Sequence, residues 1–170
     1  MSDLSGKVAV LTGGGGILCS AMASAVAERG ATVAVLDLNL AAAQKVTDGI
    51  TSAGGKAIAA EADVLSRESL EKAAQTIHDR CGPVDILVNG AGGNKAEATA
   101  GGEMSFFDIP ADAIQWVFNL NCLGTILASQ VFVRDMVEKK EGVVVNIASM
   151  CGIRPLTRVV SYSAAKAAIA

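Results

Sequence analysis

Three side chains late in this 170-residue sequence have the types and spacing needed to move a proton. Tyr162 and Lys166 are four residues apart, and Ser149 lies thirteen residues before Tyr162. On a helix, positions i and i+4 share a face, so the Lys166 ammonium could lie beside the Tyr162 ring. A phenol with an ordinary pKa of about 10 is a poor base near neutral pH, and a neighbouring cation favours its ionised form. The spacing therefore predicts a proton-transferring site built around a phenol.

A glycine-rich turn near the start of the chain could bind a phosphate. A strand predicted over residues 7–12 runs into the sequence TGGGGI at 12–17, and a helical pattern continues through Ala27. Glycines at such a turn let the backbone approach a pyrophosphate, whose charge then faces the free N–H groups and positive end of the helix. The combination of strand, turn and helix predicts a dinucleotide site.

Asp37 is placed to bind the adenosine ribose. It ends the second predicted strand, twenty-one residues after Gly16, where a carboxylate can accept hydrogen bonds from ribose hydroxyls. The same carboxylate would repel a ribose phosphate, and neither Leu38 nor Asn39 offers a cation. NAD is therefore favoured over NADP. Asp37 could instead cap the next helix, although Asn39 could fill that role equally well.

Two further strand ends offer groups to a nucleotide. Asp63, just past the third predicted strand, could accept a hydrogen bond from an adenine amino group, or it could be an ordinary turn residue. Residues 89–92 (NGAG) follow the fourth strand with small side chains, where a nucleotide would need space. The Gly- and Ala-rich stretch 92–103 is long for a strand-to-helix link, and loops at the carboxyl ends of parallel strands bind ligands.

The elements that must position these residues alternate between short apolar runs and longer helical patterns. Strands are predicted over 7–12, 32–37, 57–60, 85–88 and 143–147. They are continuous apolar runs, as expected when helices cover both faces of a sheet. The alternation predicts an α/β fold with a Rossmann-like, doubly wound parallel sheet. The helical segment 111–139 is apolar nearly all round, which predicts contact with a second subunit, or else a large core.

Composition excludes several other classes of protein. With 51% hydrophobic and 18% charged residues the chain is globular, and a net charge of -3 with a pI near 5.1 excludes the basic footprint of a nucleic-acid binder. No run approaches the ~20 apolar residues of a membrane span, and the apolar run after Lys7 is too short for a signal peptide. We therefore expect a cytoplasmic protein.

Cysteine and histidine usage narrows the chemistry. The four cysteines lie far apart, so neither a zinc site nor a disulfide framework is predicted. The only histidine, His78, lies beside Asp79 and Arg80 on a polar helical stretch, where a solvated or helix-flank role is expected. No metal site or Ser-His-Asp hydrolase is therefore expected, and chemistry must come from Ser, Tyr, Lys and carboxylates.

Together with Asn121, these motifs resemble the short-chain dehydrogenase/reductase family in order along the whole chain. The resemblance implies that Tyr162 is the general acid/base, that Lys166 lowers its pKa and holds the nicotinamide ribose, that Ser149 orients the substrate oxygen, and that Asn121 supports a water-linked proton relay. It also implies NAD contacts from a larger set, comprising Gly13, Gly15, Gly16, Ile17, Asp37, Asp63, Val64, Asn89, Gly90, Ala91, Tyr162 and Lys166.

Two features depart from the family pattern. An ungapped comparison has Ile17 and Cys19 where the family places its second and third glycines, and Cys19 puts a side chain where the helix normally packs tightly on the strand. Family members also continue past Ala170 with further strands and a substrate lid. We therefore expect residues 1–170 to be a single dinucleotide-binding domain of a C-terminally truncated chain, which could be an inactive fragment.

Within the family, residues 90–94 and 149–157 resemble the D-mannonate oxidoreductase (fructuronate reductase-like) branch, which interconverts sugar acids and their keto forms. Lys95, Arg154 and Arg158 are then candidates to hold a substrate carboxylate, unless they are plain surface charges. With the apolar segment 111–139, we expect a homo-oligomer, a dimer or tetramer, when the chain is complete.

Two alternative functions stay open. A non-catalytic dinucleotide-binding module is disfavoured by the intact set of acid/base residues. A sugar-nucleotide epimerase is favoured by the Gly13 to Gly16 spacing but fits poorly with residues 89–92.

Overall fold

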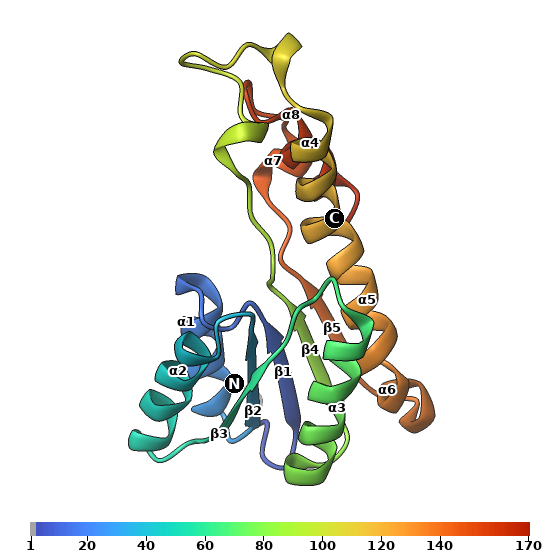
Figure 1. Ribbon diagram of the computed structural model, residues 1–170. Helices are drawn as coiled ribbons and strands as arrows, with labels where there is room; N and C mark the ends of the chain where they lie inside the picture. Colours follow the sequence, from blue (N-terminus) through green and yellow to red (C-terminus); the bar gives the residue numbers. More distant parts are fainter. Residues whose placement is uncertain (1–2) are drawn as a thin grey trace.

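A five-stranded parallel sheet forms the centre of the computed structural model, which describes residues 3–170 (Figure 1). The strands lie in the order β3-β2-β1-β4-β5, and the order reverses between β1 and β4. Ligands bind outside the carboxyl ends of strands at such a reversal. The strand bounds are β1 Val8–Thr12, β2 Thr32–Asp37, β3 Lys56–Glu61, β4 Ile86–Asn89 and β5 Val143–Asn146. The predicted α/β fold is confirmed, and each predicted strand is present with its ends shifted by no more than one residue.

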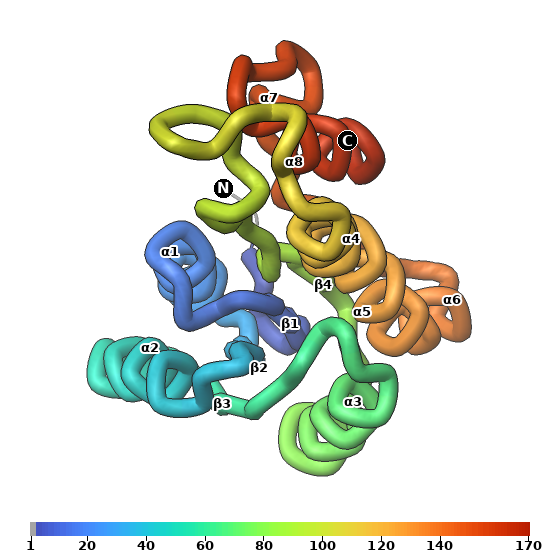
Figure 2. Tube along the Cα trace, turned by 45° about the horizontal axis from the view of Figure 1, so that its top comes forward, coloured from blue at the N-terminus to red at the C-terminus, as the bar shows by residue number. Residues whose placement is uncertain are grey.

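Helices cover both faces of the sheet. α1 and α2 pack on one face, and α3, α5 and α6 lie on the other (Figure 2). α4, α7 and α8 stand beyond the carboxyl ends of the strands (Figure 1). The helix bounds are α1 Ile17–Ala27, α2 Leu40–Ser52, α3 Arg67–Cys81, α4 Ala111–Phe118, α5 Gly124–Phe132, α6 Arg134–Lys139, α7 Met150–Ile153 and α8 Val160–Ala167, with short helical turns η1 Ala96–Ala98 and η2 Phe106–Asp108 and a π-helical turn η3 Asn119–Leu123.

The core consists of two apolar layers, one on each side of the sheet. Because successive side chains of a strand point to opposite faces, alternate residues of β1 and β2 belong to different layers. Ala9, Leu11, Val33 and Val35 pack toward α1 and α2, whereas Val8, Val10, Ala34 and Leu36 pack toward α3 and α5. The continuous apolar runs of the sequence are thus explained for β1 and β2, which have covered faces.

β5 departs from that expectation. Val143, Val144 and Val145 are 54%, 42% and 40% exposed, and within residues 3–170 β5 pairs only with β4, at an edge of the sheet. An apolar run therefore did not indicate two covered faces at this strand.

The apolar segment 111–139 also differs from a single uniform helix. It consists of α4, the π-helical turn, α5 and α6 in succession. Ile114, Trp116, Leu123 and Ile126 are 38–46% exposed on it. The predicted contact with a second subunit stays a prediction. Among residues 3–170, no helix has the length and apolarity needed to cross a membrane.

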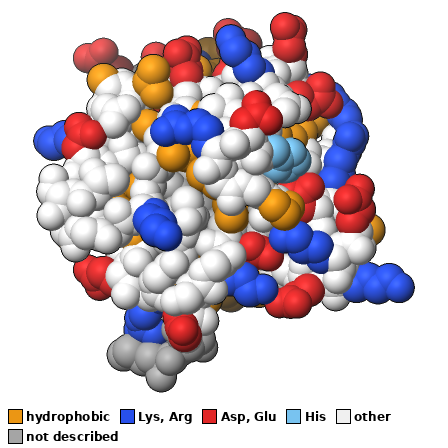
Figure 3. Space-filling model, turned by 90° about the horizontal axis from the view of Figure 1, so that it is seen from below, with side chains coloured by type: hydrophobic (Ala, Val, Ile, Leu, Met, Phe, Trp, Pro, Cys, Tyr) orange, Lys and Arg blue, Asp and Glu red, His pale blue; other side chains and the backbone are white. Residues whose placement is uncertain are grey.

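The amino ends of the strands carry paired charges. Asp85 lies 3.0 Å from the Lys139 ammonium and 3.7 Å from that of Lys7, which in turn lies 2.8 Å from Glu141. Acidic and basic side chains intermingle on the face of the molecule seen from below (Figure 3). His78 lies in the last turn of α3 with its side chain 42% exposed, and its Nε2 lies 2.8 Å from the carboxylate of Asp135.

Candidate functional site

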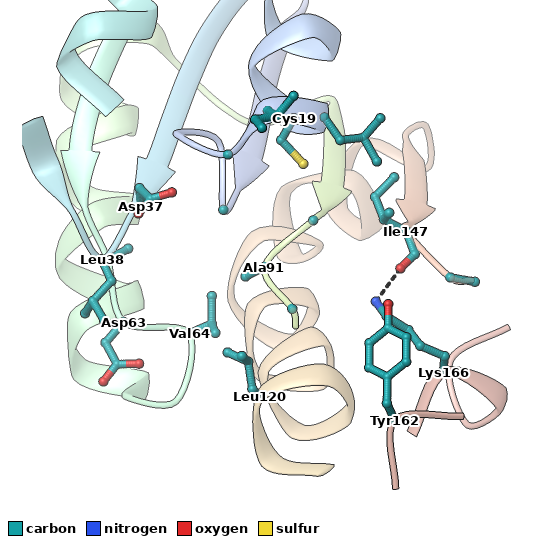
Figure 4. Close-up of a pocket in the computed structure, with 18 residues that line it drawn as sticks. Cys19, Asp37, Leu38, Asp63, Val64, Ala91, Leu120, Ile147, Tyr162 and Lys166 are labelled. Atoms are coloured by element: carbon teal, nitrogen blue, oxygen red, sulfur yellow. Dashed lines mark hydrogen bonds between the residues drawn. The ribbon is translucent and has the colours of Figure 1, made fainter. Parts of the chain in front are cut away.

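A cavity of about 520 Å³ lies at the carboxyl ends of β1, β2 and β4 (Figure 4). Its size is within the range of about 300–1,000 Å³ that is typical of small-molecule sites. Asp37 and Asp63 lie toward one end of it, and Tyr162 and Lys166 lie at the other. Of the predicted contact residues, those on the cavity wall are Gly13, Gly16, Ile17, Asp37, Asp63, Val64, Gly90, Ala91, Tyr162 and Lys166.

The glycine turn brings backbone close to this cavity. Gly13 has a φ of +63°, and a Cβ atom added there would lie 2.8 Å from the Cα atom of Ala91. The N-cap residue of α1 is Gly16, which has no side chain to cap the helix. The N–H groups at the start of α1 are therefore available to an anion.

Asp37 is oriented by backbone N–H groups. Its Oδ2 accepts a hydrogen bond from the Gly15 N–H at 3.0 Å, and its Oδ1 accepts one from the Asn39 N–H at 2.9 Å. Because a carboxylate has about four acceptor positions, capacity is left for a ligand hydroxyl. Asn39, rather than Asp37, caps α2 through a 3.2 Å bond from the Ala42 N–H. Gly15 lies behind the carboxylate and does not line the cavity.

Asp63 lies where it could contact a nucleotide, and it also makes the hydrogen bond of a turn residue. It lines the cavity, and its Oδ1 accepts a hydrogen bond from the Leu65 N–H at 2.8 Å, as a turn residue does. Its second oxygen accepts no hydrogen bond within residues 3–170.

Tyr162 and Lys166 meet at the other end of the cavity, as the i, i+4 spacing predicts. The Lys166 Nζ lies 5.8 Å from the centroid of the Tyr162 ring and donates a 2.6 Å hydrogen bond to the carbonyl of Ile147. Lys166 is only 4% exposed, and no carboxylate of residues 3–170 lies within ion-pair distance. Burial lowers the pKa of Lys166, and the nearby Cys19 opposes this effect. An unpaired buried ammonium at a cavity wall is suited to holding a hydroxyl-bearing ligand.

Asn121 lies behind this end and not on the cavity wall. Its side chain is fully buried at the π-helical turn, where its Nδ2 donates to the carbonyls of Gly93 and Val117 and its Oδ1 accepts from the Gly93 N–H. A Cβ atom added to Gly92 would lie 2.7 Å from the Asn121 Oδ1 and 3.2 Å from the Lys166 Nζ. The Asn121 Oδ1 and the Lys166 Nζ therefore both lie next to Gly92, whose missing side chain leaves room for them.

Ser149 and Asn89 are also placed off the cavity wall. The Ser149 hydroxyl accepts a 3.2 Å hydrogen bond from the Cys151 N–H and caps the short helix α7. The Asn89 amide donates to Ser129 and Asn146 at 3.0 Å each and joins β4 to α5 and β5. The Ser149 hydroxyl still has its own O–H to donate, and the Asn89 Oδ1 is buried with no hydrogen-bond partner in residues 3–170. The roles predicted for these two residues therefore stay predictions.

Two residues that support the site, Ile147 and Thr12, were not predicted from the sequence. The carbonyl of Ile147 holds Lys166, and the Thr12 hydroxyl accepts hydrogen bonds from the N–H groups of Gly90 and Ala91 at 3.1 and 3.2 Å. Thr12 is 1% exposed, and a polar residue at the end of an apolar strand was a signal that could have found it. Nothing in the sequence distinguishes the carbonyl of Ile147 from any other.

The predicted carboxylate-binding residues lie outside the cavity wall. The Lys95 ammonium is 5.4 Å from the centroid of the Trp116 ring. The Arg158 side chain lies across Gly101, and Arg158 has a φ of +76°. Arg154 is exposed at the end of α7.

Comparisons with known proteins identify a family for the chain. The profile of the short chain dehydrogenase family matches residues 7–170. Two curated relatives are an uncharacterised oxidoreductase of Haemophilus influenzae, 43% identical over 98% of this chain, and an uncharacterised oxidoreductase UxuB of Bacillus subtilis, 45% identical over 98%. The chain spans 62% and 63% of the length of these relatives.

Solved structures superpose closely on the chain. One is a Haemophilus influenzae protein with bound NAD, provisionally named a D-mannonate oxidoreductase, with a TM-score of 0.94, 43% identity, and coverage of 98% of this chain and 63% of that one. Another is an NAD+-bound xylitol dehydrogenase, with a TM-score of 0.91, 30% identity, and coverage of 99% and 62%.

Proposed function

This chain belongs to the short-chain dehydrogenase family, and we propose that it supplies the NAD-binding and acid/base parts of an oxidoreductase that interconverts a secondary alcohol and a ketone. The observation that carries the proposal is the single cavity with Asp37 toward one end and the Tyr162 and Lys166 pair at the other. A dinucleotide needs a carboxylate for one ribose and a reactive group beside its nicotinamide. The spacing of these residues along one cavity supports that fit.

The residues that would hold NAD offer backbone groups, a carboxylate or an ammonium. Gly13, Gly16 and Ile17 would face the pyrophosphate, Asp37 would accept from the adenosine ribose, and Lys166 would donate to the nicotinamide ribose. Asp63, Val64, Gly90 and Ala91 would line the remaining length. NAD itself would supply the hydride-accepting chemistry.

The chain's own contribution to the reaction is proton transfer and positioning. The Tyr162 hydroxyl, as phenolate, would take the proton of the substrate alcohol, and it would return that proton in the reverse direction. Lys166 would hold a positive charge beside it, fixed by the Ile147 carbonyl. Asn121 would support the relay indirectly by fixing Gly93. The Ser149 hydroxyl accepts from the Cys151 N–H and keeps its O–H to donate to a substrate oxygen.

The test compares cofactor binding and turnover in the purified protein. Titration should give tighter binding of NAD than of NADP, because Asp37 would repel a ribose phosphate. Tyr162→Phe should lower turnover by about 10²- to 10⁴-fold while NAD still binds, since only the proton-transferring hydroxyl is lost. NADP binding as tight as NAD, or turnover close to that of the unchanged protein, would contradict the respective assignment.

A sugar acid is the substrate class that we propose within this function. The likeness to the structure provisionally named a D-mannonate oxidoreductase supports it, and so do Lys95, Arg154 and Arg158 on the segments beyond the reactive end. The measurement is kcat/KM for a panel of sugar acids and matched uncharged polyols. Equal kcat/KM values for the sugar acids and the uncharged polyols would contradict recognition of a substrate carboxylate.

A second candidate is a dinucleotide-binding module without turnover. The position of Ser149 favours it, because the hydroxyl caps α7 and does not line the cavity. NAD binding that Tyr162→Phe leaves intact, together with no turnover of any alcohol in the panel, would support this candidate.

A further inference from the structure

The thiol of Cys19, on α1, lies against the backbone of Gly90, which directly follows β4. Both residues line the cavity. Cys19 is in the first turn of α1, is 4% exposed, and lines the cavity together with Gly90. A Cβ atom added to Gly90 would overlap the Cys19 Sγ and would lie 2.8 Å from the carbonyl oxygen of Thr12. Figure 4 shows the sulfur of Cys19 directed from α1 toward the end of β4. The sulfur thus occupies the space that a side chain at position 90 would need.

The side chain in this arrangement is on α1, at Cys19, and the glycine is on the loop after β4, at Gly90. Dinucleotide-binding turns use a glycine early in the helix, because a missing side chain lets the helix pack closely on the sheet. Here residue 19 has a side chain, and Gly90, on the opposite wall, has none. Close packing is therefore retained by removing volume from the loop after β4 instead of from α1.

Other contacts fix the same two walls against each other. The Thr12 hydroxyl accepts hydrogen bonds from the N–H groups of Gly90 and Ala91. A Cβ atom added to Gly13 would also lie 2.8 Å from the Ala91 Cα and N atoms. Because the walls touch at several points, extra volume at one point cannot be absorbed without moving Gly13 or Ala91, which line the cavity.

The Cys19 sulfur acts through its size. Burial raises the pKa of the Cys19 thiol, Asp37 raises it further, and Lys166 works in the opposite direction. The group is therefore a neutral thiol at neutral pH, which behaves as a small apolar side chain.

We propose that Cys19 and Gly90 are a complementary pair of positioning residues that sets the width of the cofactor cavity, so that dinucleotide affinity depends on their combined size. The inference rests on the proposed NAD function for its binding readout. It predicts that position 90 accepts a side chain only when position 19 becomes smaller.

A double-mutant cycle tests the pair. Gly90→Ala should weaken NAD binding by about tenfold or more, since overpacking at a rigid contact forces backbone shifts. Cys19→Ala should weaken it by about threefold or less, because only part of the contact is removed. The combined variant should recover about threefold or more of the loss caused by Gly90→Ala, and the two changes should be non-additive. Recovery should be incomplete, because the Thr12 carbonyl still lies 2.8 Å from the new methyl group.

Isothermal titration with NAD and the melting temperature are measured for all four proteins, and kcat is separated from the KM for NAD. The KM should change more than kcat, since the pair does not touch Tyr162. Gly49→Ala in α2 is the matched control, because a Cβ atom added there meets nothing within 4 Å.

If the effects of Gly90→Ala and Cys19→Ala on NAD affinity and on melting temperature simply add in the combined variant, the proposal that the two residues are a complementary pair is wrong. If Gly90→Ala does not fold, recovery of folded protein in the combined variant supports the pair, and its absence contradicts it. If the unchanged protein does not bind NAD, the proposed function fails, while coupling in the melting temperatures still decides whether the pair exists.

Discussion

The two ends of the parallel sheet use charged side chains differently. At the amino end, Asp85 accepts from the Val8 N–H and pairs with Lys139 and Lys7. At the carboxyl end, the carboxylate of Asp37 and the ammonium of Lys166 make their hydrogen bonds within residues 3–170 to backbone groups, and neither has an oppositely charged side chain as a partner. Opposite charges therefore compensate one another at the first end, whereas at the second end fixed charges face a cavity. Uncompensated charge that is held in place is what a ligand-binding site needs.

The largest expected effect comes from removing charge at the carboxyl end. Lys166→Met should lower turnover by about 10²-fold or more, because positioned charges at a reacting group contribute on that scale. Its free energy of unfolding at pH 7 should not fall. Burial lowers the pKa of Lys166 below its ordinary value of 10.5, so the ammonium reduces stability at neutral pH. This loss of stability is fully present at pH values below the pKa of Lys166 in the folded protein. It disappears as the pH rises from that pKa to the higher pKa of Lys166 in the unfolded chain.

Denaturant titration at pH 7, with turnover measured on the same samples, checks both parts of this expectation. A marked loss of stability in Lys166→Met would mean that the lysine serves the fold, as the amino-end charges do.

The second largest effect should come from removing a charge at the amino end of the sheet, where we expect stability to fall and activity to stay the same. Asp85→Asn should lower the free energy of unfolding by about 1–3 kcal/mol, because the carboxylate accepts a backbone N–H and pairs with two ammonium groups. NAD affinity and turnover per folded molecule should stay the same. Thermal and denaturant unfolding measure the first part, and titration with NAD measures the second.

The pH dependence of Asp85 gives an independent check. Partial burial works to raise the pKa of Asp85, but the Val8 N–H, Lys139 and Lys7 outweigh it, and the pKa lies below 3.8. Its stabilising contribution is therefore fully present above 3.8 and is lost as the pH falls through the lower folded value. The difference in stability between Asp85→Asn and the unchanged protein should shrink below pH 3.8. A constant difference would assign the effect to packing instead.

The smallest effect should come from the exposed partner at the same end. Glu141 is 72% exposed and contacts Lys7 at 2.8 Å, so solvent and salt screen the pair. Glu141→Gln should leave the melting temperature unchanged within error at physiological salt. A shift as large as that of Asp85→Asn would show that the whole charged group, and not Asp85 alone, stabilises the amino end.

The strands were predictable because each is a short apolar run between polar segments, and chain order then placed the glycine turn, Asp37, Asp63 and residues 89–92 at one edge. The i, i+4 spacing likewise predicted that Tyr162 and Lys166 share a face. The roles predicted for Ser149, Asn89 and Asn121 stay predictions. Their local hydrogen bonds, at α7, at β5 and at Gly93, were not predictable, because the order of residues along the chain does not fix the partner of a polar side chain.

By itself, the sequence determined the order of strands and helices, because apolar periodicity and glycine positions act over a few residues. It also determined which side chains reach the carboxyl edge of the sheet. Only the tertiary structure decided that the Ile147 carbonyl holds Lys166, that β5 is exposed, and that the Cys19 thiol fits against Gly90. These features depend on contacts between segments far apart in the chain, where the available volume and the nearest partner are set only when the sheet is assembled.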